Sequence, residues 1–121
     1  MMQAFYKPKG PIAPRLSEIA DTLTEVLKIS ELAMPFIKGK RNQQARAIRL
    51  LVKTTRRALT QTTRLQTFIK ANNIYWGDDK EGGGYIYPPE IFYAIIAQMD
   101  QWDAAVTECL EARDRFAKAV R

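Results

Sequence analysis

The sequence contains no histidine and a single cysteine, Cys109. The missing imidazole excludes histidine general bases, Ser-His and Cys-His catalytic pairs and most types of zinc site. One thiol cannot form a disulfide within the chain and suits a reducing compartment, so we expect a cytoplasmic protein. Long apolar runs are also missing, so we expect no membrane span and no signal peptide. We therefore expect a protein that is not an enzyme and that needs no cofactor and no metal.

Acidic residues are missing from the middle of the chain. Residues 32–77 contain ten Lys or Arg and no Asp or Glu, whereas residues 78–121 contain five basic and nine acidic side chains. The whole chain has 19 basic and 13 acidic side chains, a formal net charge of +6. Such a basic block needs a polyanion, an acidic protein surface or the chain's own acidic third to neutralise it.

The length of 121 residues fits one domain. Prolines recur through residues 1–15, which predicts an extended N-terminal arm. Residues 16–121 read as one all-α helical bundle, because apolar residues recur at helical spacing. The pattern predicts a short helix at about 17–34 and two long helices at about 42–72 and 89–120. We expect the two long helices to form an antiparallel α-hairpin.

The linker 74–87 has two competing interpretations. Its aromatic and β-branched flanks favour a small β-hairpin, whereas its three consecutive glycines favour a loose loop. Tyr75 and Trp76 directly follow the basic helix and are candidates for stacking on unpaired bases. The alternative is that these aromatic side chains cap the open end of the bundle. The acidic residues at the tip lack the ligand order of a calcium loop, so no metal site is expected there.

The basic residues of the helix predicted at 42–72 share one face. At about 100° per residue they lie opposite a seam of apolar and small residues that would face the core. Arginine is the side chain best suited to phosphate because its guanidinium pairs bidentately with two oxygens. We therefore predict a phosphate-contacting surface that consists of Lys40, Arg41, Arg46, Arg49, Lys53, Arg56, Arg57 and Arg64. The sequence does not separate RNA from DNA, or single from double strands.

A second interpretation of this basic face is that it binds an acidic protein. The chain would then be an assembly, adaptor or virion structural protein. Binding to nucleic acid should weaken steeply with salt and be competed by unrelated polynucleotides, whereas protein docking should survive added polynucleotide.

The helix predicted at 89–120 carries a repeat with alternating spacings of three and four, which predicts a core or oligomer seam. The seam consists of Met99, Trp102, Val106, Cys109, Arg113 and Phe116. Arg113 either pairs at an oligomer seam and fixes its register, or extends its charged end to water. Because the short helix covers only part of the long hairpin, we expect a homo-oligomer.

In size, basic charge and helix content the chain resembles the small helical subunits of CRISPR effector complexes and the helical-bundle accessory proteins of diversity-generating reverse transcriptases. The resemblance implies a non-enzymatic accessory subunit of a nucleoprotein complex that contacts a larger protein. No recognition helix, zinc finger or RNA-recognition sheet is evident in the sequence, so we expect contacts to the phosphate backbone with little sequence specificity.

Overall fold

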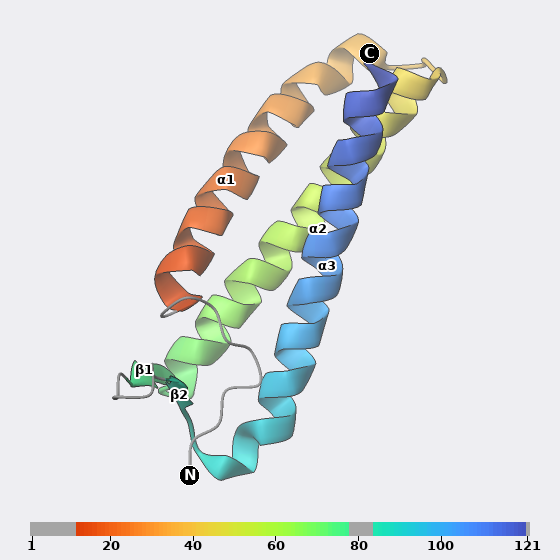
Figure 1. The fold of residues 1–121 in the computed structure, drawn as a ribbon. Helices are drawn as coiled ribbons and strands as arrows, with labels where there is room; N and C mark the ends of the chain where they lie inside the picture. Colours follow the sequence, from red (N-terminus) through yellow and green to blue (C-terminus); the bar gives the residue numbers. More distant parts are fainter. Residues whose placement is uncertain (1–11, 78–83, 121) are drawn as a thin grey trace.

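The computed structural model describes residues 12–77 and 84–120. Its helices are α1 (Ile12–Ala33), α2 (Gln43–Ala71) and α3 (Phe92–Ala119), with short 3-10 turns at η1 (Met34–Ile37) and η2 (Pro89–Ile91). Two three-residue strands, β1 (Tyr75–Gly77) and β2 (Gly84–Ile86), lie between α2 and α3. The three helices form an elongated bundle (Figure 1). The predicted all-α class is confirmed.

The helix α1 begins earlier than the sequence predicts. It starts at Ile12 rather than near Ser17, so the last residues of the predicted extended arm are helical. The prediction was wrong because it counted Pro14 as a helix breaker. Pro14 lies in the first turn of the helix, where backbone N–H groups have no partner within the helix. The N–H that proline lacks is therefore not needed at this position. The rest of the predicted arm, residues 1–11, lies outside the described residues.

Capping interactions define the two ends of α2. The Asn42 side chain accepts a hydrogen bond from the Ala45 backbone N–H at 2.8 Å, which satisfies one of the unpaired donors of the first turn. Just before it, Gly39 has a φ of 78°, a conformation that suits glycine and turns the chain out of η1. Asn73 has a φ of 54° and ends the helix in the left-handed region that Asn tolerates. The predicted bounds at about 42 and 72 are therefore close to those of the structure.

The helices α2 and α3 pack side by side and run in opposite directions (Figure 1). Near one end Gln44 Nε2 donates to the Ala119 carbonyl at 3.2 Å. Farther along α2, Thr62 Oγ1 accepts a hydrogen bond from Trp102 Nε1 at 3.0 Å. Moving forward along α2 thus means moving backward along α3.

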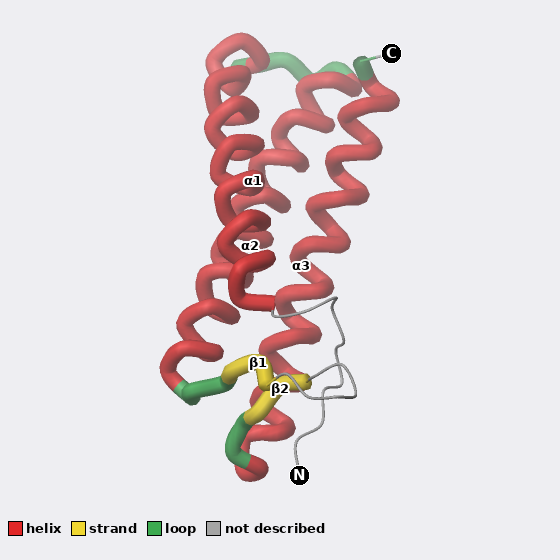
Figure 2. Tube along the Cα trace, turned by 60° about the vertical axis from the view of Figure 1, so that its left-hand side comes forward, coloured by secondary structure: helices red, strands yellow, loops and turns green. Residues whose placement is uncertain are grey.

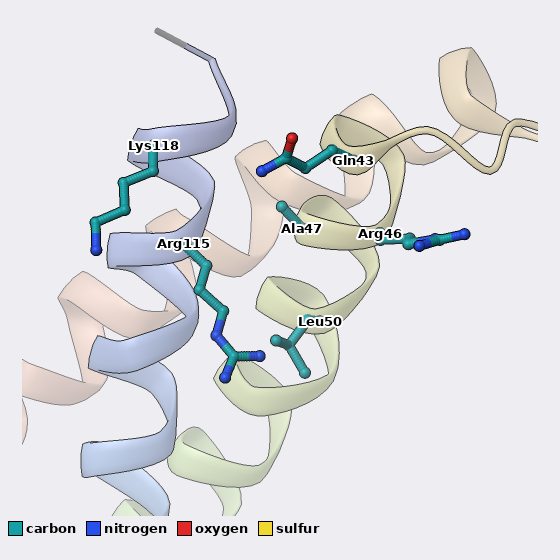
Figure 3. Close-up of a pocket in the computed structure, with 6 residues that line it drawn as sticks. All are labelled: Gln43, Arg46, Ala47, Leu50, Arg115 and Lys118. Atoms are coloured by element: carbon teal, nitrogen blue, oxygen red, sulfur yellow. The ribbon is translucent and has the colours of Figure 1, made fainter.

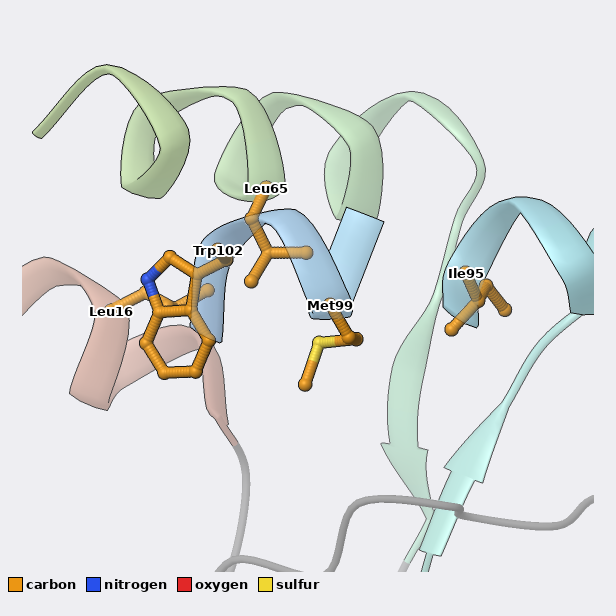
Figure 4. Close-up of a cluster of buried hydrophobic side chains, with 5 residues drawn as sticks. All are labelled: Leu16, Leu65, Ile95, Met99 and Trp102. Atoms are coloured by element: carbon orange, nitrogen blue, oxygen red, sulfur yellow. The ribbon is translucent and has the colours of Figure 1, made fainter. Parts of the chain in front are cut away.

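Two apolar clusters hold the three helices together. The first combines one residue of α1, one of α2 and three of α3, and the aromatic ring of Trp102 lies beside Leu16 at one end of it (Figure 4). Its members are Leu16, Leu65, Ile95, Met99 and Trp102. The second cluster, nearer the C-terminus of α3, is built from smaller side chains: Leu23, Ala58, Ala105 and Cys109. The residues of the predicted seam of α3 up to Cys109 are therefore part of this chain's own core.

Beyond Cys109 one predicted seam position, Arg113, is not part of the core of this chain, and its pairing at an oligomer seam stays a prediction. Arg113 was assigned a seam position, but its side chain is 65% exposed and lies 3.5 Å from Asp114. Ala112, at 1% exposure, occupies the buried position instead. A strict seven-residue repeat assumes 3.5 residues per turn, while a straight helix has 3.6, so the buried stripe drifts by about 20° per heptad. Within this chain, Arg113 extends to water.

The strands β1 and β2 pair antiparallel, with Tyr75 opposite Ile86 and Gly77 opposite Gly84. The pair lies at the end of the bundle where α2 ends and α3 begins (Figure 2). The connecting residues 78–83, which include the acidic tip of the predicted linker, lie outside the described residues.

The first helix is too short to cover both of its neighbours. α1 has 22 residues, while α2 and α3 have 29 and 28. It packs mainly on α2 and leaves several large apolar side chains in contact with water. The most exposed on this side are Ile29 at 65%, Leu32 at 67% and Phe36 at 77%.

Candidate nucleic-acid interface

Most of the cations predicted to contact phosphate are exposed on α2 or just before it. Lys40, Arg41, Arg46, Lys53, Arg56, Arg57 and Arg64 are all exposed. The exception is Arg49, which is half-buried. The six cations on α2 form two groups that differ in their surroundings, while Lys40 and Arg41 precede α2 and belong to neither group.

The first group faces α1 and is engaged within the chain. Arg49 Nη2 donates a hydrogen bond of 2.9 Å to the carbonyl oxygen of Ile37, and so holds η1 against α2. Arg56 Nη2 lies 3.5 Å from a carboxylate oxygen of Glu31 near the end of α1. Both guanidinium groups thus have a role in holding α1 and η1 on α2, although a surface pair such as Arg56–Glu31 contributes only about 0–1 kcal/mol.

The second group forms a row on the α3 side of α2. Arg46, Lys53, Arg57 and Arg64 are separated by seven, four and seven residues, which places them within an arc of about 40°. The row is about 27 Å long at 1.5 Å per residue. It borders the groove between α2 and α3, and a hollow of that groove lies beside each of its members.

One hollow lies where α2 begins and α3 ends, and we call this end of the groove its open end. This hollow is basic and has no acidic side chain in its lining. Figure 3 shows Arg115 and Lys118 on α3 beside the first two turns of α2. The lining residues are Gln43, Arg46, Ala47, Leu50, Arg115 and Lys118. In this view the Arg115 guanidinium lies between the helices near Leu50, while Arg46 extends away from α3 and the Lys118 side chain extends along the side of α3 away from α2. Cations therefore lie on both sides of the first turns of α2.

The next hollow along the groove has mixed charge. Lys53, Arg57 and Arg115 line it together with Glu108 and Glu111. Arg57 Nη1 pairs with Glu108 Oε2 at 2.8 Å, and both side chains are about half exposed. Because water screens this pair, it is worth about 0–1 kcal/mol and holds Arg57 only loosely.

The third hollow contains Arg64, but most of its surface is apolar. It is lined by Thr63, Arg64, Thr67, Phe68, Ala71, Asn72 and Gln98. The two threonines and Asn72 are neutral hydrogen-bond donors of the kind that assist phosphate binding. The groove thus carries at least one cation in each of its three hollows.

Two cations of the groove, Arg115 and Lys118, were missed by the sequence prediction. The reason is that they belong to a segment with a net negative charge, residues 78–121, which was treated as the acidic third. Their spacing of three residues places them on neighbouring positions of one helix face, and the packing of α3 on α2 then brings that face to the groove. The spacing was visible in the sequence, but the packing was not.

Of the other predicted site residues, those of the α3 seam do not line these hollows. Tyr75 and Trp76 lie in β1, and their side chains are outside what the structure describes. Met99, Trp102 and Cys109 are buried and Val106 is half-buried, and these four serve the core, whereas Phe116 is half-buried outside the two clusters.

Residues 12–77 and 84–120 contain no group of three or more His, Cys, Asp or Glu side chains that could hold a metal ion. No helix in these ranges is long and apolar enough to cross a membrane. Comparison of the chain with protein-family models, with curated proteins and with solved structures gives no match.

Proposed function

We propose that this protein binds the phosphate backbone of RNA or DNA with little sequence specificity, as a non-enzymatic accessory subunit of a cytoplasmic nucleoprotein complex. The observation that carries the proposal is the row of cations on the α3 side of α2. None of the described acidic side chains forms an ion pair with Arg46, Lys53 or Arg64. Their charge is therefore available to an external polyanion.

The chemistry of the row fits phosphate. Fixed cations on a rigid helix meet the regularly spaced charges of a nucleic-acid backbone and release its condensed counterions. Such contacts position a strand but read no bases, which is the reason for expecting little sequence specificity. A row of about 27 Å matches about eight base pairs, at 3.4 Å each.

A competition experiment tests this proposal. Labelled single- and double-stranded RNA and DNA of about 20 nucleotides are titrated with the protein, and unlabelled polynucleotides of unrelated sequence are then added. We expect binding of at least one substrate and its displacement by every sequence of the same class. A well-folded protein that binds none of the four at low salt would contradict the proposal.

The second candidate function is docking of an acidic protein. Ala47 and Leu50 form an apolar floor between the cations of the open-end hollow, and an acidic amphipathic helix would match both features. A complex of this kind should persist when polynucleotide is added in excess. The same competition experiment therefore separates the two candidates.

We also propose that the chain forms a homo-oligomer and that the antiparallel hairpin of α2 and α3 is the frame on which subunits assemble. The large exposed apolar side chains of Ile29, Leu32 and Phe36, which lie on α1 and η1 and not on the hairpin itself, support the oligomer. Contact with a second subunit would remove them from water.

A further inference from the structure

The cations of this chain form two classes that the sequence alone does not distinguish. Arg49 and Arg56 are bound to Ile37 and Glu31 on the α1 side. Arg115 and Lys118, from the helix with the most acidic residues, lie in the α2–α3 groove where no acidic side chain lines the open end. A ligand with several negative charges would meet the second class without displacing an internal partner.

We propose that the open end of the α2–α3 groove is the principal phosphate-binding site, and that Arg115 and Lys118 of α3 hold the strand there together with Arg46 and Lys53 of α2. Arg49 and Arg56 position α1 and η1 and do not contact phosphate. This inference rests on the proposed nucleic-acid binding and assigns the contacts within it.

The shape of the open end supports the assignment. Its volume of about 230 Å³ exceeds the share of a single water molecule, about 30 Å³, several times over, so that a phosphate group can enter. The floor of Ala47 and Leu50 offers no hydrogen-bonding group that would compete for the cations. Gln43 adds an amide donor at the rim of the hollow (Figure 3). The hollow therefore has an apolar base, a neutral donor at its rim and the Arg115 guanidinium over it, with Arg46 and Lys118 extending outward on its two sides.

A purely structural role does not account for Arg115 and Lys118. Cations in the last turns of a helix interact favourably with its terminal carbonyl groups. In this chain, however, Gln44 of α2 already donates to the Ala119 carbonyl at 3.2 Å. No ion pair of Arg115 or Lys118 with another described residue is found. Both charges are exposed and remain available to a ligand.

The strength of phosphate binding should also differ along the groove. From the open end, the row continues through Lys53 and Arg57 to Arg64 in the third hollow. Glu108 and Glu111 lie in the middle hollow, where they oppose a phosphate. Phosphates should therefore be held most tightly at the open end and less tightly toward Arg64.

Matched double variants test the inference. Arg115→Gln/Lys118→Gln and Arg49→Gln/Arg56→Gln each remove two positive charges, so their net charges are equal. For the groove variant we expect at least tenfold weaker binding of the preferred oligonucleotide. The slope of log affinity against log salt should also become shallower by about 1.5, since each lost phosphate contact removes about 0.7–0.9. For the α1-side variant we expect the affinity for the oligonucleotide to change by less than about threefold. This variant loses no phosphate contact, and only the general electrostatic attraction between protein and strand becomes slightly weaker.

A third variant covers the case in which the groove variant fails to fold. Gln43→Glu places a carboxylate at the rim of the open-end hollow, in the first turn of α2, where the helix dipole favours an acidic residue. We expect this variant to unfold at the same or a higher temperature and yet to bind the oligonucleotide at least threefold more weakly.

The outcomes separate this inference from the proposed function. Equal losses in the two double variants, or unchanged binding by both the groove variant and Gln43→Glu, would overturn the groove assignment while leaving nucleic-acid binding intact. Absence of binding by the unmodified protein would overturn the proposed function and this assignment with it.

Discussion

Trp102 of α3 donates a hydrogen bond of 3.0 Å from its indole Nε1 to Thr62 Oγ1 of α2, and the threonine is fully buried. The same hydroxyl donates to the Ala58 carbonyl at 2.7 Å. One hydroxyl thus acts as acceptor between the helices and as donor within its own helix. The pair fixes the register of α2 against α3, and through that register the position of Arg115 beside the first turns of α2.

Thr62→Val should therefore destabilise the fold although it preserves the side-chain shape. Removal of the interior acceptor of the Trp102 indole N–H should lower the free energy of unfolding by about 1–3 kcal/mol. Urea unfolding followed by circular dichroism measures this change. Thr55→Val is the matched control, because Thr55 is equally buried but its hydroxyl lies 3.4 Å from the weaker partner Cys109 Sγ. A larger loss for Thr55→Val than for Thr62→Val would contradict this account of the interface.

Leu65→Ala should be among the most damaging core substitutions. Leu65 has 2% of its surface exposed and packs against side chains of both α1 and α3. Its truncation leaves a cavity among three helices, which typically costs about 2–5 kcal/mol. Leu110→Ala is the control, since Leu110 is 45% exposed and should lose less than about 1 kcal/mol. Chemical unfolding of both variants checks the difference, and similar losses would show that the core lies elsewhere.

The sequence predicted the elements of this fold better than their relations to one another. Helical periodicity located α2 and α3 to within a few residues, because both carry long amphipathic patterns. It misplaced the start of α1, where the effect of Pro14 depends on its position in the first turn. It also placed Arg113 on the same stripe as the core residues, although a seven-residue repeat drifts on a straight helix and Arg113 is exposed within this chain.

The candidate site was predicted only in part, for a different physical reason. The spacing of basic residues along α2 is local information, and it correctly indicated an exposed basic surface. Which members of that surface are engaged internally depends on long-range contacts such as Arg49 with Ile37 and Arg56 with Glu31. The contribution of Arg115 and Lys118 likewise depends on how α3 packs against α2, which the charge of an isolated segment does not reveal.

Glu108→Gln should strengthen nucleic-acid binding. The substitution releases Arg57 from its pair at 2.8 Å and removes a carboxylate from the middle hollow. We expect affinity for the preferred oligonucleotide to rise about threefold to tenfold at low salt, as one more cation becomes able to contact phosphate. The matched control is Glu31→Gln, which makes the same change of charge on the α1 side and should have a smaller effect. Binding titrations of the two variants give the answer, and an equal increase in both would indicate that only net charge matters.

Leu32→Gln/Phe36→Gln should shift the protein toward the monomer. Both residues are at least two-thirds exposed within one chain, so the substitution should cost little fold stability but remove apolar area from a contact between subunits. Light scattering coupled to size-exclusion chromatography measures the mass over a range of concentrations. We expect the unmodified protein to be larger than 13.9 kDa. A monomeric mass at every concentration would contradict the proposed oligomer.

The central claim, that exposed cations of the α2–α3 groove bind a nucleic-acid backbone, is tested most directly by the salt dependence of binding by the unmodified protein. Six cations line the groove, of which Arg57 would have to exchange Glu108 for a phosphate: Arg46, Lys53, Arg57, Arg64, Arg115 and Lys118. If all six contact phosphates, log affinity should fall against log salt with a slope of about −4 to −5. A slope near zero, or no binding at low salt by a folded protein, would contradict the claim.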